Sequence, residues 1–558
     1  MVVHVADDAL PGSQGEVDGA IGGRSVVIAA TFTAEPVVAA VAYWMEHYRL
    51  NVMVKPAPYG QVLEQVALPD SDLVRAGTDL AVILIRIEDY LRGPASDGRA
   101  RARVTAHLIE LAAAIDAFLE DGGGPLLLGV MPTTEPDPPR GLGEWARRKL
   151  RDCLKPHPTA LWVDLEEALD LYEVRSIADP LRGEIAHIPY SDECLAAVGT
   201  AVARRIRALW GVPRKAIALD CDNTLWAGAC SEDPLGELDA EGPYRRLRVF
   251  MRQQAETGRL LCLVSRNRPE DVEAAFERYG DPLEGGDIVA RRCGWDDKAD
   301  SLQSLAEELG LDVDSFVFVD DDPLECAEIK ERLPGVSVLE LPPDPHLIPR
   351  TLRHAWELDF AFLTEADRRR SRSYLANRKL SEGLRRSRDA PSFLAGLNVR
   401  VSLARARADE LPRVVQLFHR TNQFNCTGWR PSSSALKHFA SDEKSGIWTV
   451  RVVDRLGDYG LVGALLTSRA EAEVRVEQIA LSCRVFKRSV ERSMLSELFA
   501  ALDPRPARIL IAFRETERNL PARRFLEVHG EEVTRSGTDD TRWFSVGADL
   551  SAGKCLDR

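Results

Sequence analysis

Two aspartates spaced two residues apart are the residues of this sequence best suited to chemistry. The apolar run 216–219 leads into Asp220, and Asp222 follows two positions later. Residues two apart on an extended segment point to the same side, so both carboxylates can face one small volume. One carboxylate can then attack phosphorus while its neighbour moves a proton, with a cation neutralising their repulsion. A strand that simply ends in an Asx turn is the alternative, and the pair alone does not separate the two.

Three further segments follow in the order that such chemistry needs. The run LLCLVSRN at 260–267 contains Ser265, whose small hydroxyl suits a phosphate oxygen. Lys298 supplies a cation at a predicted helix start, and the run at 315–322 ends in three consecutive aspartates. Each segment has an ordinary explanation: a turn serine, a solvated lysine or an acidic loop. Four such motifs in sequence, three of them at the ends of predicted buried strands, favour a phosphoryl-transfer site.

This set of motifs resembles the haloacid dehalogenase (HAD) superfamily of aspartate-nucleophile phosphotransferases. The resemblance implies that Asp220 is the nucleophile and Asp222 the general acid/base. It also implies that four residues bind the transferring phosphoryl group: Thr224, Ser265, Arg266 and Lys298.

The resemblance further implies a Mg²⁺ site. Its ligands would be Asp220, Asp320 and the backbone carbonyl of Asp222, while Asp321 orients the site. Mg²⁺ suits such a site because it favours carboxylates, waters and substrate phosphate. Only about forty residues separate the first two motifs, too few for a large cap domain. We therefore expect an open site, with room for a protein-borne substrate or for a neighbouring domain as a lid.

Composition bounds the class of protein. A chain of 558 residues with 45% hydrophobic and 28% charged residues is typical of a soluble protein of about three domains. A net charge of −15 argues against nucleic acid as a partner. No apolar run approaches the roughly twenty residues of a membrane span, and the start does not resemble a signal peptide. Ten cysteines without a C-x-x-C pair indicate neither zinc nor disulfides, so a cytoplasmic location is expected.

Elements that position these motifs follow an α/β pattern. Strand-like runs alternate with helical patterns, which predicts parallel sheets covered on both faces. We predict a tail over 1–24, a flavodoxin-like three-layer domain over 25–212 and a Rossmann-like domain over 213–355. A basic helical linker over 356–395 and a mixed α/β domain over 396–550 complete the chain. The linker carries nine Lys or Arg within 365–388, which indicates either a solvated helix or a docking surface for an acidic partner.

Several longer strings extend the resemblance over roughly residues 25–545. They are APYGQVLEQV, GEIAHIPYSDECLAAVGTAVARRI, ALDCDNTLWAGACSEDP, RTNQFNCTGWR, GDYGLVG and SCRVFKRSVE. In this order they resemble the FkbH-like proteins of polyketide biosynthesis. That resemblance implies a GDSL/SGNH-hydrolase-like domain, then the HAD domain, then a GNAT acetyltransferase-like domain.

The implied activity joins two reactions on 1,3-bisphosphoglycerate. The acyl group becomes a glyceryl thioester on the phosphopantetheine thiol of an acyl carrier protein, and the phosphate at C3 is removed with Mg²⁺. A cysteine suits the first reaction because a thiolate is a good acyl acceptor. Cys230 is the first candidate and Cys483 the second. A small-molecule phosphatase and a non-catalytic scaffold that binds carrier proteins remain the alternatives.

The two flanking domains depart from their families at the expected catalytic positions. Residues 30–33 read Ala-Thr-Phe-Thr where the hydrolase nucleophile Ser is expected, and Glu184-x-x-His187 replaces the usual Asp-x-x-His. The acetyltransferase pyrophosphate loop corresponds to 484–489, where side chains replace both glycines. We therefore predict weak binding of acetyl-CoA. The residues proposed instead for contact with a carrier protein's arm are Cys483, Arg484, Lys487 and Arg488.

Overall fold

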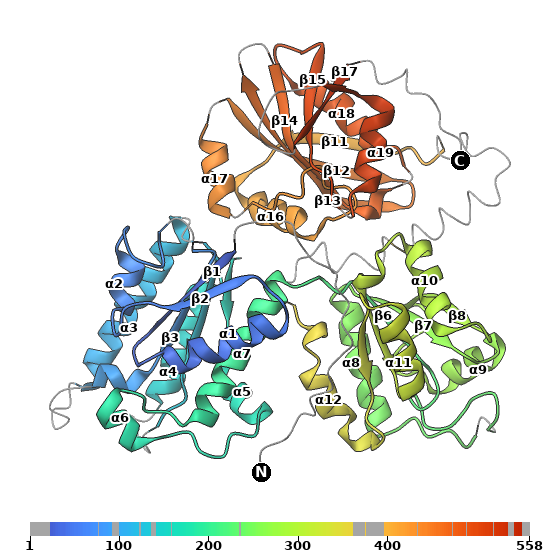
Figure 1. Ribbon diagram of the computed structural model, residues 1–558. Coiled ribbons are helices and arrows are strands. Elements are labelled where there is room, and N and C mark those ends of the chain that lie inside the picture. The colour runs from blue at the N-terminus through green and yellow to red at the C-terminus, as the bar shows by residue number, and fades with distance from the viewer. Residues whose placement is uncertain are drawn as a thin grey trace.

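In the computed structural model the chain forms three domains, each built on one β-sheet (Figure 1). Parallel sheets form the first two domains and a mixed sheet the third, which confirms the predicted α/β class. The structure describes residues 23–75, 78–91, 100–121, 124–134, 141–157, 159–233, 236–360, 374, 396–431, 433–442, 444–470, 473–486, 488–516, 518–533 and 541–548. None of the helices in these ranges is long and apolar enough to cross a membrane.

The first domain is a parallel sheet with helices on both faces. Its strand order is β2-β1-β3-β4-β5, with bounds β1 Arg24–Ala30, β2 Val52–Pro56, β3 Leu80–Ile85, β4 Leu126–Val130 and β5 Ala160–Trp162. Helices α1 (Glu35–His47) and α7 (Asp192–Trp210) pack on one face. Helices α2 (Val62–Ala67), α3 (Ala100–Glu120) and α4 (Leu142–Leu154) pack on the other. Two short helices, α5 (Leu165–Leu171) and α6 (Pro180–Ala186), precede α7.

The second domain repeats the three-layer plan. Its strand order is β10-β9-β6-β7-β8, with bounds β6 Ala216–Leu219, β7 Leu260–Ser265, β8 Ile288–Cys293, β9 Phe316–Asp320 and β10 Ser337–Glu340. Helices α8 (Pro243–Glu256), α9 (Pro269–Tyr279) and α12 (Ile348–His354) cover one face. Helices α10 (Lys298–Leu309) and α11 (Pro323–Arg332) cover the other. Every residue of β6, β7 and β9 is buried, as expected for strands inside a parallel sheet.

The third domain has a seven-stranded mixed sheet in the order β11-β12-β13-β14-β15-β17-β16. The strand bounds are β11 Arg400–Arg405, β12 Ser445–Asp454, β13 Gly457–Ala470, β14 Glu473–Leu481, β15 Arg508–Phe513, β16 Glu531–Val533 and β17 Arg542–Gly547. Helices α16 (Leu411–Arg420) and α17 (Ser433–Ser441) contribute to one core cluster. Helices α18 (Val490–Ala501) and α19 (Leu520–His529) pack into the core on the other face. Only β14 and β15 pair in parallel.

The parallel pair is short, and another part of the chain lies beyond it. Strands β14 and β15 are in register only at Val474–Val476 and Ile509–Ile511. Past that point Leu481 N donates to Phe424 O (2.9 Å) and Cys426 N donates to Ile479 O (3.0 Å). Arg514 N, just after β15, donates to Cys426 O (2.9 Å). The segment Phe424–Cys426, here called the wedge segment, therefore fills the gap between the two strands.

The first two domains are joined by a packed interface. Trp356 follows α12 and lies against Trp44 of α1 and Tyr48, the residue after α1, with ring centroids 4.9 and 5.2 Å away. Arg204 of α7 donates to Asp359 Oδ1 at 2.8 Å. Residues 356–360 thus pack onto the first domain. The remainder of the predicted basic linker, apart from Tyr374, and the predicted tail up to residue 22 lie outside the described residues.

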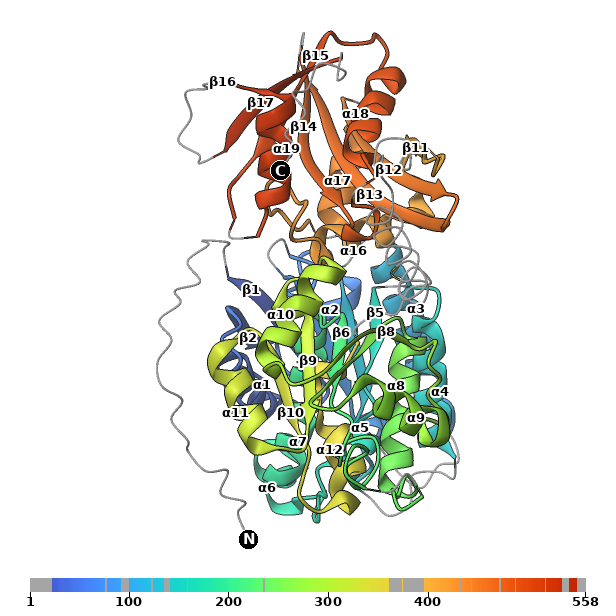
Figure 2. The same cartoon turned by 90° about the vertical axis from the view of Figure 1, so that its right-hand side faces the viewer.

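The third domain lies against one edge of both parallel sheets (Figures 1 and 2). Lys437 Nζ donates to the carbonyl of Glu120, which ends α3 just before β4 (3.1 Å). Gln423 Nε2 donates to Asp312 Oδ1, just before β9 (3.1 Å). Both contacts are at the edge where strands begin. The carboxyl ends of the same strands therefore face away from the third domain.

Candidate active site at the carboxyl edge of the second sheet

Three neighbouring strands bring the predicted site residues together. Asp320 is the last residue of β9, Asp220 follows β6, and Ser265 is the last residue of β7. Leu219, next to Asp220, is in register with Val319 and with Leu263 on its two neighbours. Parallel strands that end at one level place the following side chains at one edge of the sheet, where open α/β sheets bind ligands.

Lys298 closes the cluster from the first position of α10. Its Nζ donates to Asp220 Oδ1 at 2.8 Å and to Asp320 Oδ2 at 2.7 Å. All three side chains are buried. One cation therefore bridges the two carboxylates that the sequence assigned to the nucleophile and to the metal site.

The cluster carries more negative than positive charge. Burial raises the pKa values of Asp220 and Asp320 above their usual range, although Lys298 opposes the shift. Burial, followed by the charge of Asp320, raises the pKa of Asp321 to about 6. Burial works against the charge on Lys298, but Asp220 and Asp320 outweigh it and raise the pKa of Lys298.

Oxygen atoms of Asp220, Asp320 and Asp321 lie within 4.8 Å of one another. A second cation in this space would lower the repulsion between these carboxylates. An all-oxygen, carboxylate-rich set of ligands fits Mg²⁺. The geometry thus places Asp321 among the possible Mg²⁺ ligands, whereas the sequence analysis predicted only an orienting role for it.

Asp222 is held by donors from its own loop and from the segment after β7. Its Oδ1 accepts from Trp226 Nε1 and from the backbone N–H of Cys230, each at 3.0 Å. Its Oδ2 accepts from Asn267 Nδ2 at 2.8 Å. Three donors fix the carboxylate without neutralising it, as a proton-transfer group requires.

Asn267 is a site residue that the sequence reasoning missed. Its Nδ2 lies 2.8 Å from Asp222 Oδ2 and 2.9 Å from Ser265 Oγ, so it connects the proposed acid/base with the proposed phosphate ligand. The available signal was its place two residues after Ser265, at the end of the same apolar run.

Two predicted phosphate ligands have other partners. Thr224 is fully buried, and its hydroxyl donates to Asp321 Oδ1 at 3.3 Å. In this arrangement the Thr224 hydroxyl orients Asp321, and its contact with phosphate stays a prediction. Arg266 lies at the rim, where it pairs with Glu325 at 3.1 Å and Asp297 at 3.3 Å.

Cys230 lies in the loop after the nucleophile strand, next to Asp222. Its side chain is buried, and burial together with the charge of Asp222 raises the pKa of the thiol to about 12. The thiol is therefore protonated near neutral pH. Acyl transfer to Cys230 stays a prediction, and it requires a base such as Asp222 to remove the proton.

Between β6 and α8 the described residues form a loop rather than a cap domain. That loop contains two isolated β-bridges, Asp222–Trp226 and Ala227–Asp239. Two large apolar side chains stand exposed at the rim: Trp295, 74% exposed, and Leu324, 79% exposed. They are close in sequence to Asp297 and Glu325, the two carboxylates that Arg266 bridges. The catalytic edge is thus open and bordered by apolar surface.

The third domain holds its candidate residues away from this edge. Arg488 is fully buried and pairs with Asp454 (2.7 Å) and with the hydroxyl of Tyr459 (2.6 Å). The prediction that Arg488 contacts a carrier arm at the surface is therefore wrong, because its charge is used inside the domain. Lys487 lies outside the described residues. Arg484 is buried and its Nε donates to Ser482 Oγ (3.2 Å), and Cys483 Sγ lies 3.1 Å from the hydroxyl of Tyr374.

The first domain shows no hydrolase arrangement at residues 30–33. Thr31 Oγ1 accepts from Arg86 N (2.8 Å), and Thr33 Oγ1 donates to the carbonyl of Ala186 (2.8 Å). Both hydroxyls thus serve backbone groups. Glu184 is exposed, and His187 ends α6 with a left-handed backbone. The expected loss of hydrolysis in this domain stays a prediction.

Comparison with known proteins gives a likeness in structure alone. A scan against protein-family models and a search of curated proteins both returned no match. Among solved structures, the N-terminal part of BF1531 from Bacteroides fragilis, which contains a phosphatase domain and was crystallised with Mg, matches 61% of this chain and 94% of its own. The identity is 20% and the TM-score 0.54, which establishes a shared fold.

Two shorter likenesses involve single-domain proteins. The ribosomal-protein-S18-alanine N-acetyltransferase from Escherichia coli matches 28% of this chain and 100% of its own, at 14% identity and a TM-score of 0.21. A catalytic mutant of the acetylxylan esterase Axe2 from Geobacillus stearothermophilus matches 33% of this chain and 93% of its own, at 16% identity and a TM-score of 0.26. The likeness to BF1531 therefore shows that this chain shares the fold of a protein that contains a phosphatase domain.

Proposed function

We propose that this protein is a Mg²⁺-dependent HAD-type phosphotransferase that makes a glyceryl thioester on an acyl carrier protein from 1,3-bisphosphoglycerate. The observation that carries the phosphotransferase part is the Lys298 bridge between Asp220 and Asp320 at an open carboxyl edge. A Mg²⁺ ion held by Asp220, Asp320 and Asp321 would balance the remaining negative charge and polarise the phosphoryl oxygens. The Mg in the structure of BF1531 supports this choice of metal.

Removal of the C3 phosphate proceeds through Asp220. A carboxylate oxygen of Asp220 forms a bond to phosphorus while the bond from phosphorus to the C3 oxygen breaks. Asp222, in its acid form, gives its proton to the departing oxygen. Asp222 then takes a proton from water as that water attacks the phosphoaspartate, which releases phosphate and restores Asp220. Lys298 and Ser265 hold the phosphoryl oxygens during both steps.

Acyl transfer is the finer part of the proposal and uses Cys230. The thiolate forms a bond to C1 of the substrate, the bond from C1 to the acyl-phosphate oxygen breaks, and phosphate leaves. Asp222 is the base that accepts the thiol proton, because its Oδ1 accepts a hydrogen bond from the backbone N–H of Cys230 and so lies beside that residue. The carrier's phosphopantetheine sulfur then forms a bond to C1 as the bond from C1 to the Cys230 sulfur breaks, and the proton of the carrier thiol passes to Cys230.

A carrier protein as the acceptor is supported by the rim of the site. Trp295 and Leu324 are both exposed beside the catalytic edge. Exposed aromatic and aliphatic side chains around an open site suit contact with a protein better than with a small polar molecule. We therefore assign this rim as the docking surface for the carrier.

The decisive experiment supplies labelled 1,3-bisphosphoglycerate, Mg²⁺ and carrier protein, and measures both the mass of the carrier and phosphate release. A glyceryl mass gain on the carrier, lost in Cys230→Ala, supports the full proposal. Phosphate release without a mass gain would indicate a small-molecule phosphatase. If neither product forms, the remaining interpretation is a scaffold that binds carrier proteins.

A phosphatase without acyl transfer is the second candidate, favoured by one observation. Burial and Asp222 raise the pKa of Cys230 to about 12, which disfavours the thiolate that acyl transfer needs. Intact-mass analysis distinguishes the two functions. An acyl adduct that persists in Cys230→Ala would exclude Cys230 as the residue that carries the acyl group. Cys483 would then be the next candidate.

A further inference from the structure

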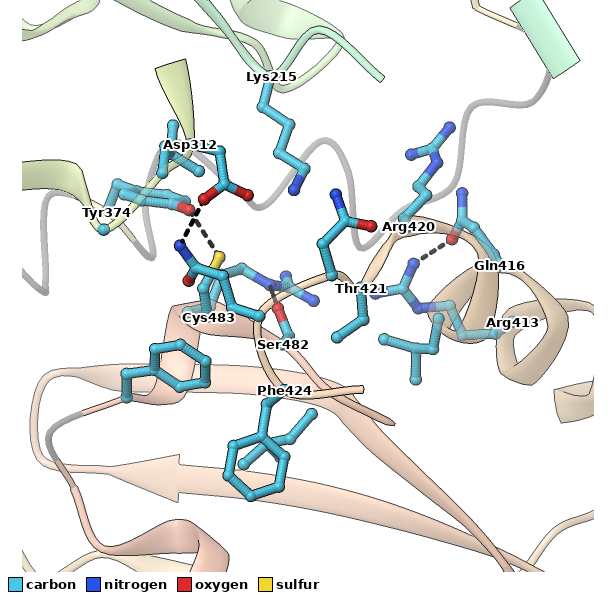
Figure 3. A pocket seen from close by; sticks show the side chains of 18 residues that line it. Lys215, Asp312, Tyr374, Arg413, Gln416, Arg420, Thr421, Phe424, Ser482 and Cys483 are labelled. Carbon is cyan, nitrogen blue, oxygen red and sulfur yellow. Dashed lines mark hydrogen bonds between the residues drawn. The ribbon is translucent and has the colours of Figure 1, made fainter. Parts of the chain in front are cut away.

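A cavity of about 50 Å³ lies between the second and third domains (Figure 3). Lys215 and Asp312 line it from the second domain, and Arg413 and Arg484 line it from the third. Lys215 precedes β6 at its amino end, whereas Asp220 follows the same strand at its carboxyl end. Five residues of extended chain separate them, or about 16 Å. This cavity is therefore distinct from the catalytic edge.

The described lining of the cavity is cationic. Four lining residues are basic (Lys215, Arg413, Arg420 and Arg484), and a single one, Asp312, is acidic. Asp312 accepts a hydrogen bond from Gln423, another lining residue, at 3.1 Å. Lys215 points into the space from the second domain (Figure 3). Such a concentration of positive charge is notable in a chain of net charge −15.

A second group of cations lies next to the cavity. Arg430 donates to Oδ1 of Asn422, which lines the cavity, at 2.9 Å. Burial, followed by repulsion from Arg518, lowers the pKa of Arg430. Burial, followed by repulsion from Arg430, lowers the pKa of Arg24 at the start of β1. An anion at this junction of three domains would relieve that repulsion.

The size of the cavity and the wedge segment limit the ligand. By the volume that one buried water needs, about 50 Å³ holds roughly four waters, or one tetrahedral anion. Phe424 lines the cavity and also begins the wedge segment, which fills the gap between β14 and β15. An extended pantetheine chain has no room to run from this cavity between those two strands.

We propose that this cavity binds the phosphate group of a compact phosphate ester, or inorganic phosphate itself, between Lys215, Arg413 and Arg484. Arg and Lys side chains are the usual partners of phosphate oxygens. The bound anion contacts both domains and strengthens their association by mass action. The proposal is independent of the proposed function, because binding at the cavity requires no turnover at Asp220.

The test is calorimetric titration of the full chain with inorganic phosphate in the absence of divalent cations. The catalytic edge then repels phosphate, because its carboxylates outnumber Lys298. Lys215→Met and Arg413→Met each keep an apolar stem and remove the charge, and each is expected to weaken binding at least tenfold. Arg508→Met removes a charge that is exposed at the far end of the third domain, and it should bind like the parent.

Three results would overturn the assignment. The first is no heat from the parent chain at millimolar phosphate. The second is loss of binding in Lys298→Met, which would put the anion at the catalytic edge. The third is phosphopantetheine binding tenfold more tightly than phosphate, which would make the cavity a site for an arm. Melting temperatures of both cavity variants confirm folding, and Lys215→Met alone decides the question if Arg413→Met does not fold.

Discussion

Lys298 neutralises only part of the charge that it contacts. Its ammonium group serves both Asp220 and Asp320, while the nearby Asp321 accepts a hydrogen bond from the neutral hydroxyl of Thr224. In buried surroundings this imbalance raises the pKa values of the carboxyl groups. The residues themselves thus create the demand for a divalent cation, and chelation of Mg²⁺ should stop phosphate release.

Asp220→Asn tests the nucleophile. The amide keeps the shape of the side chain but cannot displace a phosphate oxygen, so phosphate release should fall by about three orders of magnitude or more. Release of inorganic phosphate in single-substrate assays gives the measurement. Asp281→Asn, at an 83% exposed surface position, is the matched control and should keep the parent rate. An Asp220→Asn enzyme as fast as this control would exclude a phosphoaspartate.

Cys230 should react slowly with alkylating agents near neutral pH. Its pKa of about 12 lies above the usual value of a cysteine, so the thiolate fraction at pH 7 is smaller than for an ordinary thiol. The labelling rate should rise about tenfold for each pH unit between 7 and 9. Mass spectrometry of Cys230 peptides measures it. A rate at pH 7 equal to that of a free cysteine would show that Asp222 and burial do not hold the proton.

Residues at the ends of parallel strands were the predictable part of the site. Asp220, Ser265 and Asp320 each end an apolar run, and parallel pairing brings such ends to one edge. Asn267 carried one signal, its place two residues after Ser265. The partner of Thr224 was not predictable, because it depends on the course of loops that carry no periodic pattern. Arg488 was misassigned because its partner, Asp454, is 34 residues away and reaches it only through the folded sheet.

At the scale of elements, the β12–β13 hairpin explains the burial of Arg488. Asp454 ends β12, and Tyr459 lies near the start of β13. Their side chains converge on the guanidinium of Arg488, which precedes α18. The basic loop 484–489 was expected to contact a carrier protein's arm. Through Arg488 it instead connects α18 to the sheet.

Arg488→Met should therefore destabilise the protein rather than weaken carrier binding. Removing one partner leaves Asp454 buried and unpaired, a loss of about 3–5 kcal/mol in the free energy of unfolding. Denaturant unfolding followed by circular dichroism measures this loss. If instead the variant unfolds like the parent and loads the carrier poorly, Arg488 belongs to a docking surface after all.

The wedge segment could not have been predicted from the sequence. It is held by backbone hydrogen bonds from Leu481, Cys426 and Arg514, and backbone groups leave no signature in residue types. Side-chain support comes from Asn519, whose Nδ2 donates to the carbonyl of Asn425 at 3.0 Å. The prediction of weak acetyl-CoA binding rests on the side chains that replace both loop glycines, and it stays a prediction.

At the scale of the whole molecule, the third domain is not a lid on the catalytic site. It contacts the edge where β4 and β9 begin, and the site lies where β6, β7 and β9 end. The sequence predicted the α/β class of the chain, which the two parallel sheets and the mixed sheet confirm. It gave no information on the relative placement of domains, which depends on surface contacts such as Lys437 with Glu120.

Trp356→Ala should loosen the first two domains from each other. Trp356 is 8% exposed and lies against the rings of Trp44 and Tyr48, so its removal should lower stability by about 3–5 kcal/mol and separate the thermal transitions of the two domains. Differential scanning calorimetry measures both effects. Trp295→Ala removes an exposed ring and should change stability by less than about 0.5 kcal/mol. Equal losses in both variants would contradict a packed interface.

The wedge segment also controls how fast three amide protons of the third domain exchange with solvent. The amide protons of Cys426, Leu481 and Arg514 are hydrogen-bonded only while Phe424–Cys426 stays between the strands. Their exchange with deuterium therefore measures how often the segment leaves, separately from global unfolding. If these protons exchange as slowly as those in the centre of β13, the gap opens only when the whole domain unfolds. Any molecule that needs the space between β14 and β15 must then wait for that event.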